Sequence, residues 1–217
     1  FVEFLMLLEI LDKIYWVSCL LTLYFYAKSS QFSKRIIQLL ITSTIVAIIS
    51  YFLAKNELKN DLIFNLNNYL ELYLMYRIYE LLIHDVSKKI MIILLFLVVI
   101  FGIYDSIFIE PIDTYQGIFS FFKSICVLGL CLISFDTVYK EEKVTYLEKD
   151  AVFWLNSGIL IYYLSTLFIQ LFTNYLIASF PEYVYDFTLY LQFSLAFVFL
   201  TMLYGALRID YLKNQQP

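Results

Sequence analysis

The 217-residue sequence contains few residues that interrupt helices or bind metals. It has 5 glycines, 3 prolines, 3 cysteines and 1 histidine. Because glycine and proline are the main helix breakers, their scarcity predicts long, continuous helices. A single histidine excludes the usual zinc sites, and all three cysteines lie within apolar segments. We therefore expect no metal, no cofactor and no disulfide framework.

Charged residues are also scarce. They make up 16% of the chain, whereas soluble domains contain about 25%. Hydrophobic residues account for 62%, and 21 Phe and 20 Tyr supply most of the aromatic content. This composition predicts an integral membrane protein that packs its helices through aromatic rings and has the lipid bilayer as a partner. It gives no support for nucleic-acid binding.

Seven apolar segments are long enough to cross a bilayer as helices, which takes about 20 residues. The predicted helices cover residues 4–27, 36–54, 62–84, 90–109, 115–139, 151–177 and 184–208. The connections between them are short, so residues 1–217 are predicted to form a single domain. The expected fold class is all-α: a polytopic membrane protein built as a bundle of seven transmembrane helices.

Lysine and arginine residues predict the orientation of this bundle. With seven spans, the connections after the first, third and fifth helices share a side with the C-terminus. That side contains Lys28, Lys34, Arg35, Lys88, Lys89, Lys140, Lys143, Lys149, Arg208 and Lys213. The other side contains Lys55 and Lys59. The positive-inside rule then places the C-terminus in the cytoplasm and the N-terminus outside, in a multi-pass protein of the inner membrane.

The third apolar segment, 62–84, is unusually polar for a span. It contains Asn65, Asn67, Asn68, Glu71, Arg77 and Glu80. An ionised group near the bilayer centre costs about 2.5–3.5 kcal/mol, so this helix must be surrounded by others. At about 1.5 Å per residue, Glu71 and Lys123 lie at similar depth in the outer half. We predict that they pair; the alternative is that each side chain extends to the membrane surface or faces a separate water pocket.

Other polar side chains fall in the same outer half, which suggests a crevice open to the outside. The candidate ligand-binding residues are Asn68, Glu71, Asp105, Lys123 and Gln192. Further polar groups at this depth are Glu9, Asp12, Lys13, Asn65, Gln170, Thr173, Asn174 and Asp186. A structural polar network is expected from Glu9, Lys13, Arg77, Glu80, Asn156 and Ser157. The alternative is a set of scattered interhelical hydrogen bonds, each worth about 0.6 kcal/mol.

The tyrosines of segment 62–84 form a stripe at helical spacing: Tyr69, Tyr73, Tyr76 and Tyr79. Such a stripe is more typical of packing than of a ligand site.

Intramembrane catalytic motifs are not found. The single histidine, His84, lies at a membrane boundary, so a serine protease is not expected, and no Gly-x-Gly-Asp motif of an aspartyl protease occurs. The last helix has no lysine before Arg208 that could bind retinal. We therefore predict that the protein is not an enzyme. A small transporter remains open, because two three-helix repeats around the fourth helix fit the count, although the helices lack the Pro and Gly breaks that usually mark a transport site.

Two segments resemble a known family. Residues 68–79, Asn-Tyr-Leu-Glu-Leu-Tyr-Leu-Met-Tyr-Arg-Ile-Tyr, are similar to the third helix of an uncharacterised family of seven-transmembrane proteins in Bacteroidota. Residues 153–163, Phe-Trp-Leu-Asn-Ser-Gly-Ile-Leu-Ile-Tyr-Tyr, are similar to the start of its sixth helix. That family is similar in layout to the membrane input domains of sensor histidine kinases. The resemblance implies a sensor that acts through a separate partner.

The predicted function is therefore a non-enzymatic sensor, receptor-like protein or accessory subunit of the inner membrane. It would act through a protein partner in the membrane or cytoplasm, and its outward crevice would receive a ligand. A small transporter or channel, and a structural subunit of a larger membrane complex, are the alternatives.

Overall fold

The computed structural model describes residues 30–56, 58–84, 88–140, 147–179 and 181–213. Side chains are described for these residues except 51, 54, 148, 177, 181–194 and 196. Every regular element in these ranges is helical. The elements are α2 (Gln31–Lys55), α3 (Asp61–Leu82), α4 (Lys88–Phe108), α5 (Gly117–Lys140), the short 3-10 helix η1 (Leu147–Lys149), α6 (Ala151–Ser179) and α7 (Pro181–Lys213). The all-α prediction is confirmed for this part of the chain.

Six of the seven predicted helices fall within the described ranges, and the structure places a helix at each of them. The largest difference is α7, which extends beyond the predicted 184–208 at both ends. Its extra C-terminal turn is stabilised by contacts: Asp210 accepts hydrogen bonds from α2, and Lys213 pairs with Asp150 at 3.9 Å. Asp150 also caps α6, as expected, by accepting the Val152 N–H at 3.3 Å. The predicted helix 4–27 lies outside the described residues.

Four of the described helices are long and apolar enough to cross a membrane. The candidate spans are Gln31–Ser50, Lys88–Phe108, Gly117–Lys140 and Ala151–Leu176. The expected third span lies in α3, which has a lower mean hydropathy because it contains acidic, basic and amide side chains. The chain is thus a helical protein with the composition of a membrane protein.

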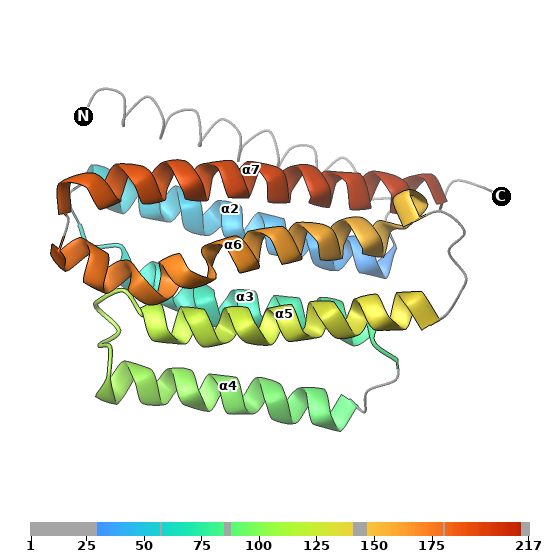
Figure 1. The fold of residues 1–217 in the computed structure, drawn as a ribbon, viewed down its shortest axis with the longest axis horizontal. Coiled ribbons are helices and arrows are strands. Elements are labelled where there is room, and N and C mark those ends of the chain that lie inside the picture. Colours follow the sequence, from blue (N-terminus) through green and yellow to red (C-terminus); the bar gives the residue numbers. More distant parts are fainter. Residues whose placement is uncertain (1–29, 57, 85–87, 141–146, 180, 214–217) are drawn as a thin grey trace.

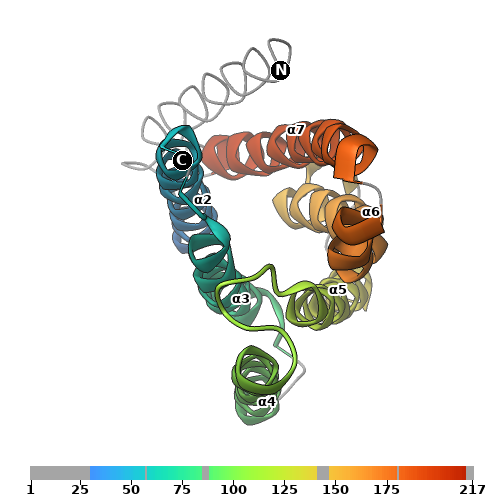
Figure 2. The ribbon, with the colours of Figure 1, turned by 90° about the vertical axis from the view of Figure 1, so that its left-hand side faces the viewer.

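The helices run in alternating directions along one long axis (Figure 1). Viewed along that axis, α2, α3, α5, α6 and α7 follow one another around a ring, and α4 lies outside the ring against α3 and α5 (Figure 2). Buried apolar residues come from every helix of the ring. The most deeply buried large side chains are Ile36, Ile37, Leu72, Met75, Ile78, Tyr79, Phe119, Leu155, Ile159, Tyr163, Leu203 and Leu207.

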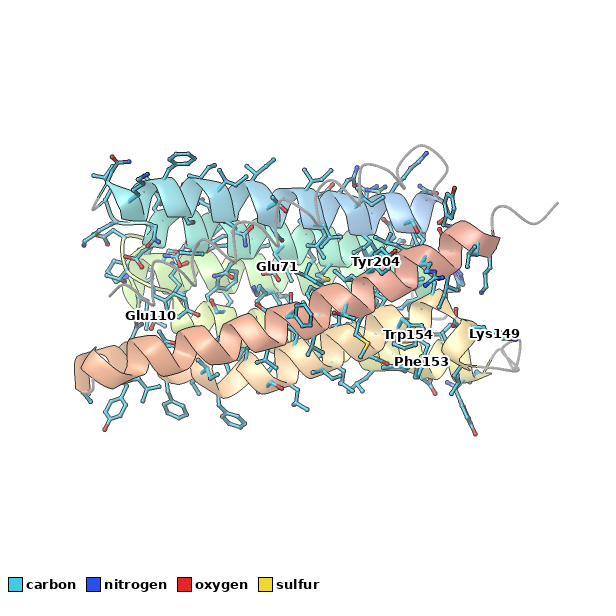
Figure 3. The ribbon with its side chains drawn as sticks, turned by 90° about the horizontal axis from the view of Figure 1, so that it is seen from above. Glu71, Glu110, Lys149, Phe153, Trp154 and Tyr204 are labelled. Carbon is cyan, nitrogen blue, oxygen red and sulfur yellow. The ribbon has the colours of Figure 1, made fainter. Side chains whose placement is uncertain are left out.

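The two ends of the bundle differ in charge. We call the end at which α3, α5 and α7 finish the basic end. Its described cationic residues are Lys34, Arg35, Lys88, Lys89, Lys140, Lys149, Arg208 and Lys213. We call the opposite end, which contains residues 109–116 between α4 and α5, the loop end. Figure 3 shows Glu110 at the loop end, Lys149 at the basic end and Glu71 between them.

The ring closes at the basic end through a small polar contact between α2 and α7. The hydroxyls of Ser30 and Ser33 each donate to the Asp210 carboxylate, both at 2.6 Å. Ser30 Oγ also accepts the Ser33 N–H at 3.2 Å, as an N-cap does at the start of a helix. The first turn of α2 is thereby tied to the last turns of α7.

Candidate functional site

A buried ion pair joins three helices near the middle of the bundle. The Lys123 ammonium of α5 donates to the Glu71 carboxylate of α3 and, at 2.8 Å, to Asn68 Oδ1. From α6, the Tyr163 hydroxyl donates to the other carboxylate oxygen of Glu71. Only 3% of Lys123 and 19% of the Glu71 side chain are exposed, and Tyr163 is fully buried. The predicted pairing of Glu71 with Lys123 is confirmed.

This arrangement keeps both charges compensated inside a chain of low polarity. Each Glu71 oxygen has one donor, and the Lys123 ammonium lies 5.8 Å from the centre of the Tyr163 ring in addition to its two acceptors. Removing one partner of a buried ion pair leaves an uncompensated charge and costs about 3–5 kcal/mol. The three helices are therefore held together by a contact that is sensitive to the charge of a single residue.

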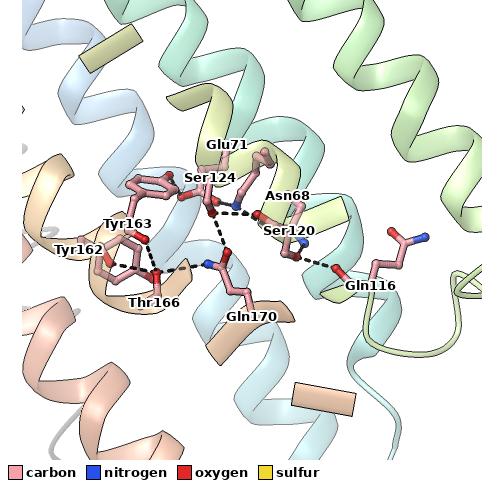
Figure 4. Close-up of polar contacts among 10 residues, drawn as sticks. Asn68, Glu71, Gln116, Ser120, Ser124, Tyr162, Tyr163, Thr166 and Gln170 are labelled. Carbon is pink, nitrogen blue, oxygen red and sulfur yellow. Dashed lines mark hydrogen bonds and ion pairs between the residues drawn. The ribbon is translucent and has the colours of Figure 1, made fainter. Parts of the chain in front are cut away.

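Hydrogen bonds extend from this pair toward the loop end (Figure 4). Asn68 Nδ2 donates to Ser120 Oγ at 2.9 Å, and Ser120 Oγ donates to the Gln116 carbonyl at 2.7 Å. One turn further along α5, Ser124 Oγ donates to Gln170 Oε1 of α6 at 2.6 Å. We call the side chains joined around Glu71 and Lys123, from Asn68 to Gln170, the polar seam.

Residues 109–116 cover the loop end of the seam. Asn65 of α3 donates from Nδ2 to the carbonyls of Ile112 and Thr114, at 2.9 and 2.6 Å, and its Oδ1 accepts the Gln116 N–H at 3.2 Å. Asn174 of α6 donates to the Glu110 carboxylate at 2.6 Å. These two asparagines, which sequence reasoning assigned to an open crevice, instead hold the loop against the helices.

The 109–116 connection also places the Glu110 carboxylate and the Tyr115 phenol at the loop end. The Glu110 carboxylate accepts the Ile118 N–H at 2.9 Å and so caps the first turn of α5. Burial raises the pKa of the neighbouring Tyr115 to about 12, and the Glu110 charge adds to the increase. The loop end thus combines a carboxylate that caps α5 with a buried, neutral phenol.

A second polar group lies on the same helices closer to the basic end. The Tyr79 hydroxyl donates to Asn156 Oδ1 at 3.1 Å, and Asn156 Nδ2 donates to Ser134 Oγ at 3.0 Å. The Asn156 carbonyl accepts the Cys131 thiol at 3.3 Å. Tyr79 therefore packs in the core, as expected for the tyrosine stripe, and Asn156 takes part in an interhelical polar contact. Ser157 is partly buried on α6 and is not joined to this contact within the described residues.

Arg77 and Glu80 form a separate cluster in the C-terminal half of α3. They pair at 3.3 Å, and Lys88 approaches Glu80 at 3.8 Å. Arg77 also donates to the Tyr73 hydroxyl at 2.9 Å. All of these side chains are partly or largely exposed, so this cluster connects neighbouring turns and α4 rather than the centre of the ring.

The other predicted site residues are distributed differently from the expectation. Asp105 is fully buried, but it lies on α4, outside the ring, and is not part of the polar seam. The side chain of Gln192 on α7 lies outside the described residues, as do Glu9, Asp12, Lys13 and Asp186. The structure thus brings together Asn68, Glu71 and Lys123 of the candidate ligand-binding set.

Sequence reasoning missed Tyr163, Ser120 and Ser124. Tyr163 is one of many tyrosines, and its sequence neighbours give no sign that it faces a carboxylate. The two serines precede and follow Lys123 on α5, and their spacing of four residues was a usable signal that this face of the helix is polar.

Comparisons with known proteins found no relative: no protein-family model, no curated protein and no solved structure matches the chain.

Proposed function

We propose that the chain is a non-enzymatic, multi-pass protein of the inner membrane that acts as a receptor-like sensor or accessory subunit. In this proposal residues 4–27 supply the first of seven spans, the N-terminus is outside and the C-terminus is cytoplasmic. The observation that supports it best is the buried Glu71–Lys123 pair, which joins α3 to α5 and receives a hydrogen bond from Tyr163 of α6.

The ion pair is placed where a local event would alter helix packing. Helices α2 and α3 pack as one hairpin, and α5, α6 and α7 pack as a second unit. Two contacts connect these units. The polar seam lies between the middle of the bundle and the loop end, and the Ser30–Ser33–Asp210 contact lies at the basic end. A charged or hydrogen-bonding ligand that competes for Glu71 or Lys123 from the loop end would weaken the seam. The equilibrium between the packing with an intact seam and a packing with a weakened seam would then shift. The size of the shift is set by the difference in the ligand's affinity for the two.

The proposed orientation rests on the charge difference between the two ends. The basic end contains eight described lysines and arginines, whereas Lys55 and Lys59 lie at the loop end. The positive-inside rule supports a cytoplasmic basic end. The signal would therefore enter at the loop end from outside and leave through the cytoplasmic connections.

A protein partner would receive that signal. The proposed similarity to membrane input domains of sensor kinases, and to the seven-span family of Bacteroidota, supports a partner with a cytoplasmic output domain. This support is analogy at the level of layout, so the partner itself must be found by experiment.

The test is recovery of the intact protein from its native membrane in nanodiscs, with bound proteins measured by mass spectrometry. We expect a stoichiometric partner, and we expect Glu71→Gln and Lys123→Met to change the amount recovered. Asp136→Asn is the matched control, because it weakens an exposed ion pair on the same α5 helix. If both seam variants fold and recover as much of the partner protein as the wild type does, the sensor proposal is wrong.

A small transporter is the second candidate, because polar groups also occupy the basic half of the bundle. The Tyr79–Asn156–Ser134 contact lies on the same helices as the polar seam, closer to the cytoplasmic end of this proposal. Solute or proton flux into proteoliposomes that contain only this protein would favour transport. Flux that is lost in Glu71→Gln but kept in Asp136→Asn would replace the sensor proposal.

A further inference from the structure

Another polar cluster lies at the loop end where α3, α4 and α5 meet, outside the polar seam. Its side chains are Tyr69 from α3, Asp105 and Ser106 from α4, and Gln116 just before α5. Gln116 Nε2 donates to Ser106 Oγ at 2.5 Å, and Ser106 Oγ lies 3.2 Å from the Tyr69 hydroxyl. Asp105 and Gln116 are both fully buried.

Every polar hydrogen on the side chains of Tyr69, Ser106 and Gln116 already takes part in a hydrogen bond. Ser106 donates its one hydroxyl hydrogen to the Gly102 carbonyl at 2.8 Å, so Tyr69 must be the donor in its contact with Ser106. Gln116 Nε2 has two hydrogens, and they go to Ser106 Oγ and, at 3.3 Å, to the Glu110 carbonyl. No hydrogen of these three side chains remains for another acceptor.

Three buried acceptor atoms are left without a hydrogen bond among the described residues: Asp105 Oδ1, Asp105 Oδ2 and Gln116 Oε1. The peptide N–H of Phe119, in the first turn of α5, is the backbone donor that approaches the Asp105 carboxyl. The nearest acidic side chain, Glu110, adds negative charge and is itself held by Ile118 and Asn174. No described lysine or arginine pairs with Asp105.

Such a cluster needs both positive charge and partners for three oxygens. A proton on Asp105 removes the charge, but its single O–H can satisfy only one further oxygen. A water molecule can donate twice, but it leaves the carboxylate charge buried and uncompensated, which is costly in a low-dielectric site. A bound cation meets both requirements, because it neutralises the carboxylate and coordinates several oxygens at once.

We propose that Asp105 and Gln116 form a binding site for one small monovalent cation, such as Na⁺, that enters from the loop end. One carboxylate matches one positive charge, and in this proposal the unpaired Gln116 amide oxygen supplies a neutral ligand. This site is separate from the Glu71–Lys123 pair and does not depend on the sensor proposal.

The bound cation would fasten α4 to the ring. Close packing already brings α4 against its neighbours here, because a Cβ on Gly102 would lie 2.6 Å from the Phe119 ring and 2.8 Å from the Tyr69 hydroxyl. Asp105 comes from α4, whereas Gln116 leads into α5. A cation held by both would link the two helices, so its binding should raise the stability of the folded protein.

The experiment measures thermal unfolding of the full-length protein in nanodiscs while NaCl replaces choline chloride at constant ionic strength. We expect a saturating increase in Tm of about 5 °C or more in NaCl. Asp105→Asn removes the charge and adds two N–H donors, so its Tm should no longer respond to Na⁺. Asp113→Asn is the matched control, because Asp113 is exposed in the same 109–116 connection and its loss should leave the increase intact.

Two outcomes would overturn the proposal. One is a wild-type Tm that does not change with NaCl at any pH. The other is a Tm that rises only on acidification, equally with and without Na⁺, because that result assigns a protonated carboxyl to Asp105. If Asp105→Asn does not fold, equilibrium binding of radioactive sodium to the wild-type protein decides: one saturable ion per chain supports the site, and no saturable binding rejects it.

Discussion

Helix α5 contains two lysines that each pair with a carboxylate, yet their surroundings are opposite. Lys123 is 3% exposed and reaches across to Glu71 on another helix. Lys140, at the basic end, is 63% exposed and pairs at 2.5 Å with Asp136, one turn earlier on its own helix. The same residue types thus form an interhelical connection in one half of α5 and a local surface contact in the other.

The difference shows how burial determines the contribution of an ion pair to the stability of the fold. An exposed pair is screened by water and salt and contributes about 0.2–1 kcal/mol. A buried pair has lost its hydration, so each charge depends on its partner and on the hydrogen bonds around it. In this protein the buried pair lies where the α2–α3 hairpin meets α5 and α6, so it joins helices that are distant in sequence.

Replacing Lys123 with Met should give the largest loss. The Glu71 carboxylate would keep only the Tyr163 hydrogen bond, and we expect the free energy of unfolding to fall by about 3–5 kcal/mol. Reversible unfolding in mixed detergent micelles measures this change.

The double variant Glu71→Leu with Lys123→Met sharpens the comparison. It removes both buried charges, so most of the lost stability should return. A double variant that is less stable than the Lys123→Met single variant would contradict the view that unpaired charge causes the loss.

Alanine at two glycines of α5 should have effects of opposite sign. A Cβ on Gly117 would lie 2.5 Å from the Gln170 carbonyl of α6, a backbone atom that cannot rotate away. We expect Gly117→Ala to lower the free energy of unfolding by about 1–3 kcal/mol. At Gly129 no atom lies within 4 Å of the added carbon, so alanine there should stabilise the helix by about 0.5–1 kcal/mol. Melting temperatures of both variants in the same detergent test the contrast, and equal shifts would refute it.

Tyr163→Phe removes one hydrogen bond from Glu71 and leaves the ring in place. We expect a loss of about 1–3 kcal/mol, because one carboxylate oxygen keeps no donor. Tyr162→Phe is the matched control on the adjacent residue, which is only partly buried. Thermal unfolding that fails to separate the two variants would show that the Tyr163 hydroxyl contributes little to the seam.

Asp136→Asn should give the smallest effect, within about 0.5 kcal/mol, and the effect should shrink further in high salt. Unfolding at low and high NaCl measures both. A loss as large as that of Lys123→Met would remove the distinction between the two halves of α5.

Much of the fold could be predicted from the sequence, because long apolar runs between charged connections fix the helices to within a few residues. The Glu71–Lys123 pair was also predictable, because the expected spans place these two opposite charges at similar depth, and buried charges tend to find partners. Depth alone does not say which side of a helix faces the ring, however. For this reason Asp105 was grouped with Glu71, although α4 places it outside the ring.

The partners of the seam depend on contacts between distant segments, which local patterns do not reveal. Tyr163 lies in a helix rich in aromatic residues, and nothing in its sequence neighbourhood separates a packing tyrosine from one that donates to a carboxylate. Asn65 and Asn174 were placed correctly near the loop end. Their role in holding the 109–116 connection appears only when α3 and α6 are seen beside it.

In the proposed transmembrane arrangement, the sequence separation of the seam residues has a consequence for how the chain would enter the membrane during synthesis. Glu71 precedes Lys123 by 52 residues and Tyr163 by 92. Helix α3 therefore leaves the ribosome long before the two side chains that stabilise its carboxylate exist. In that arrangement Glu71 needs contact with water or another polar partner until α6 has emerged. A nascent chain that stops before Tyr163 should then hold α3 less firmly than the complete chain does.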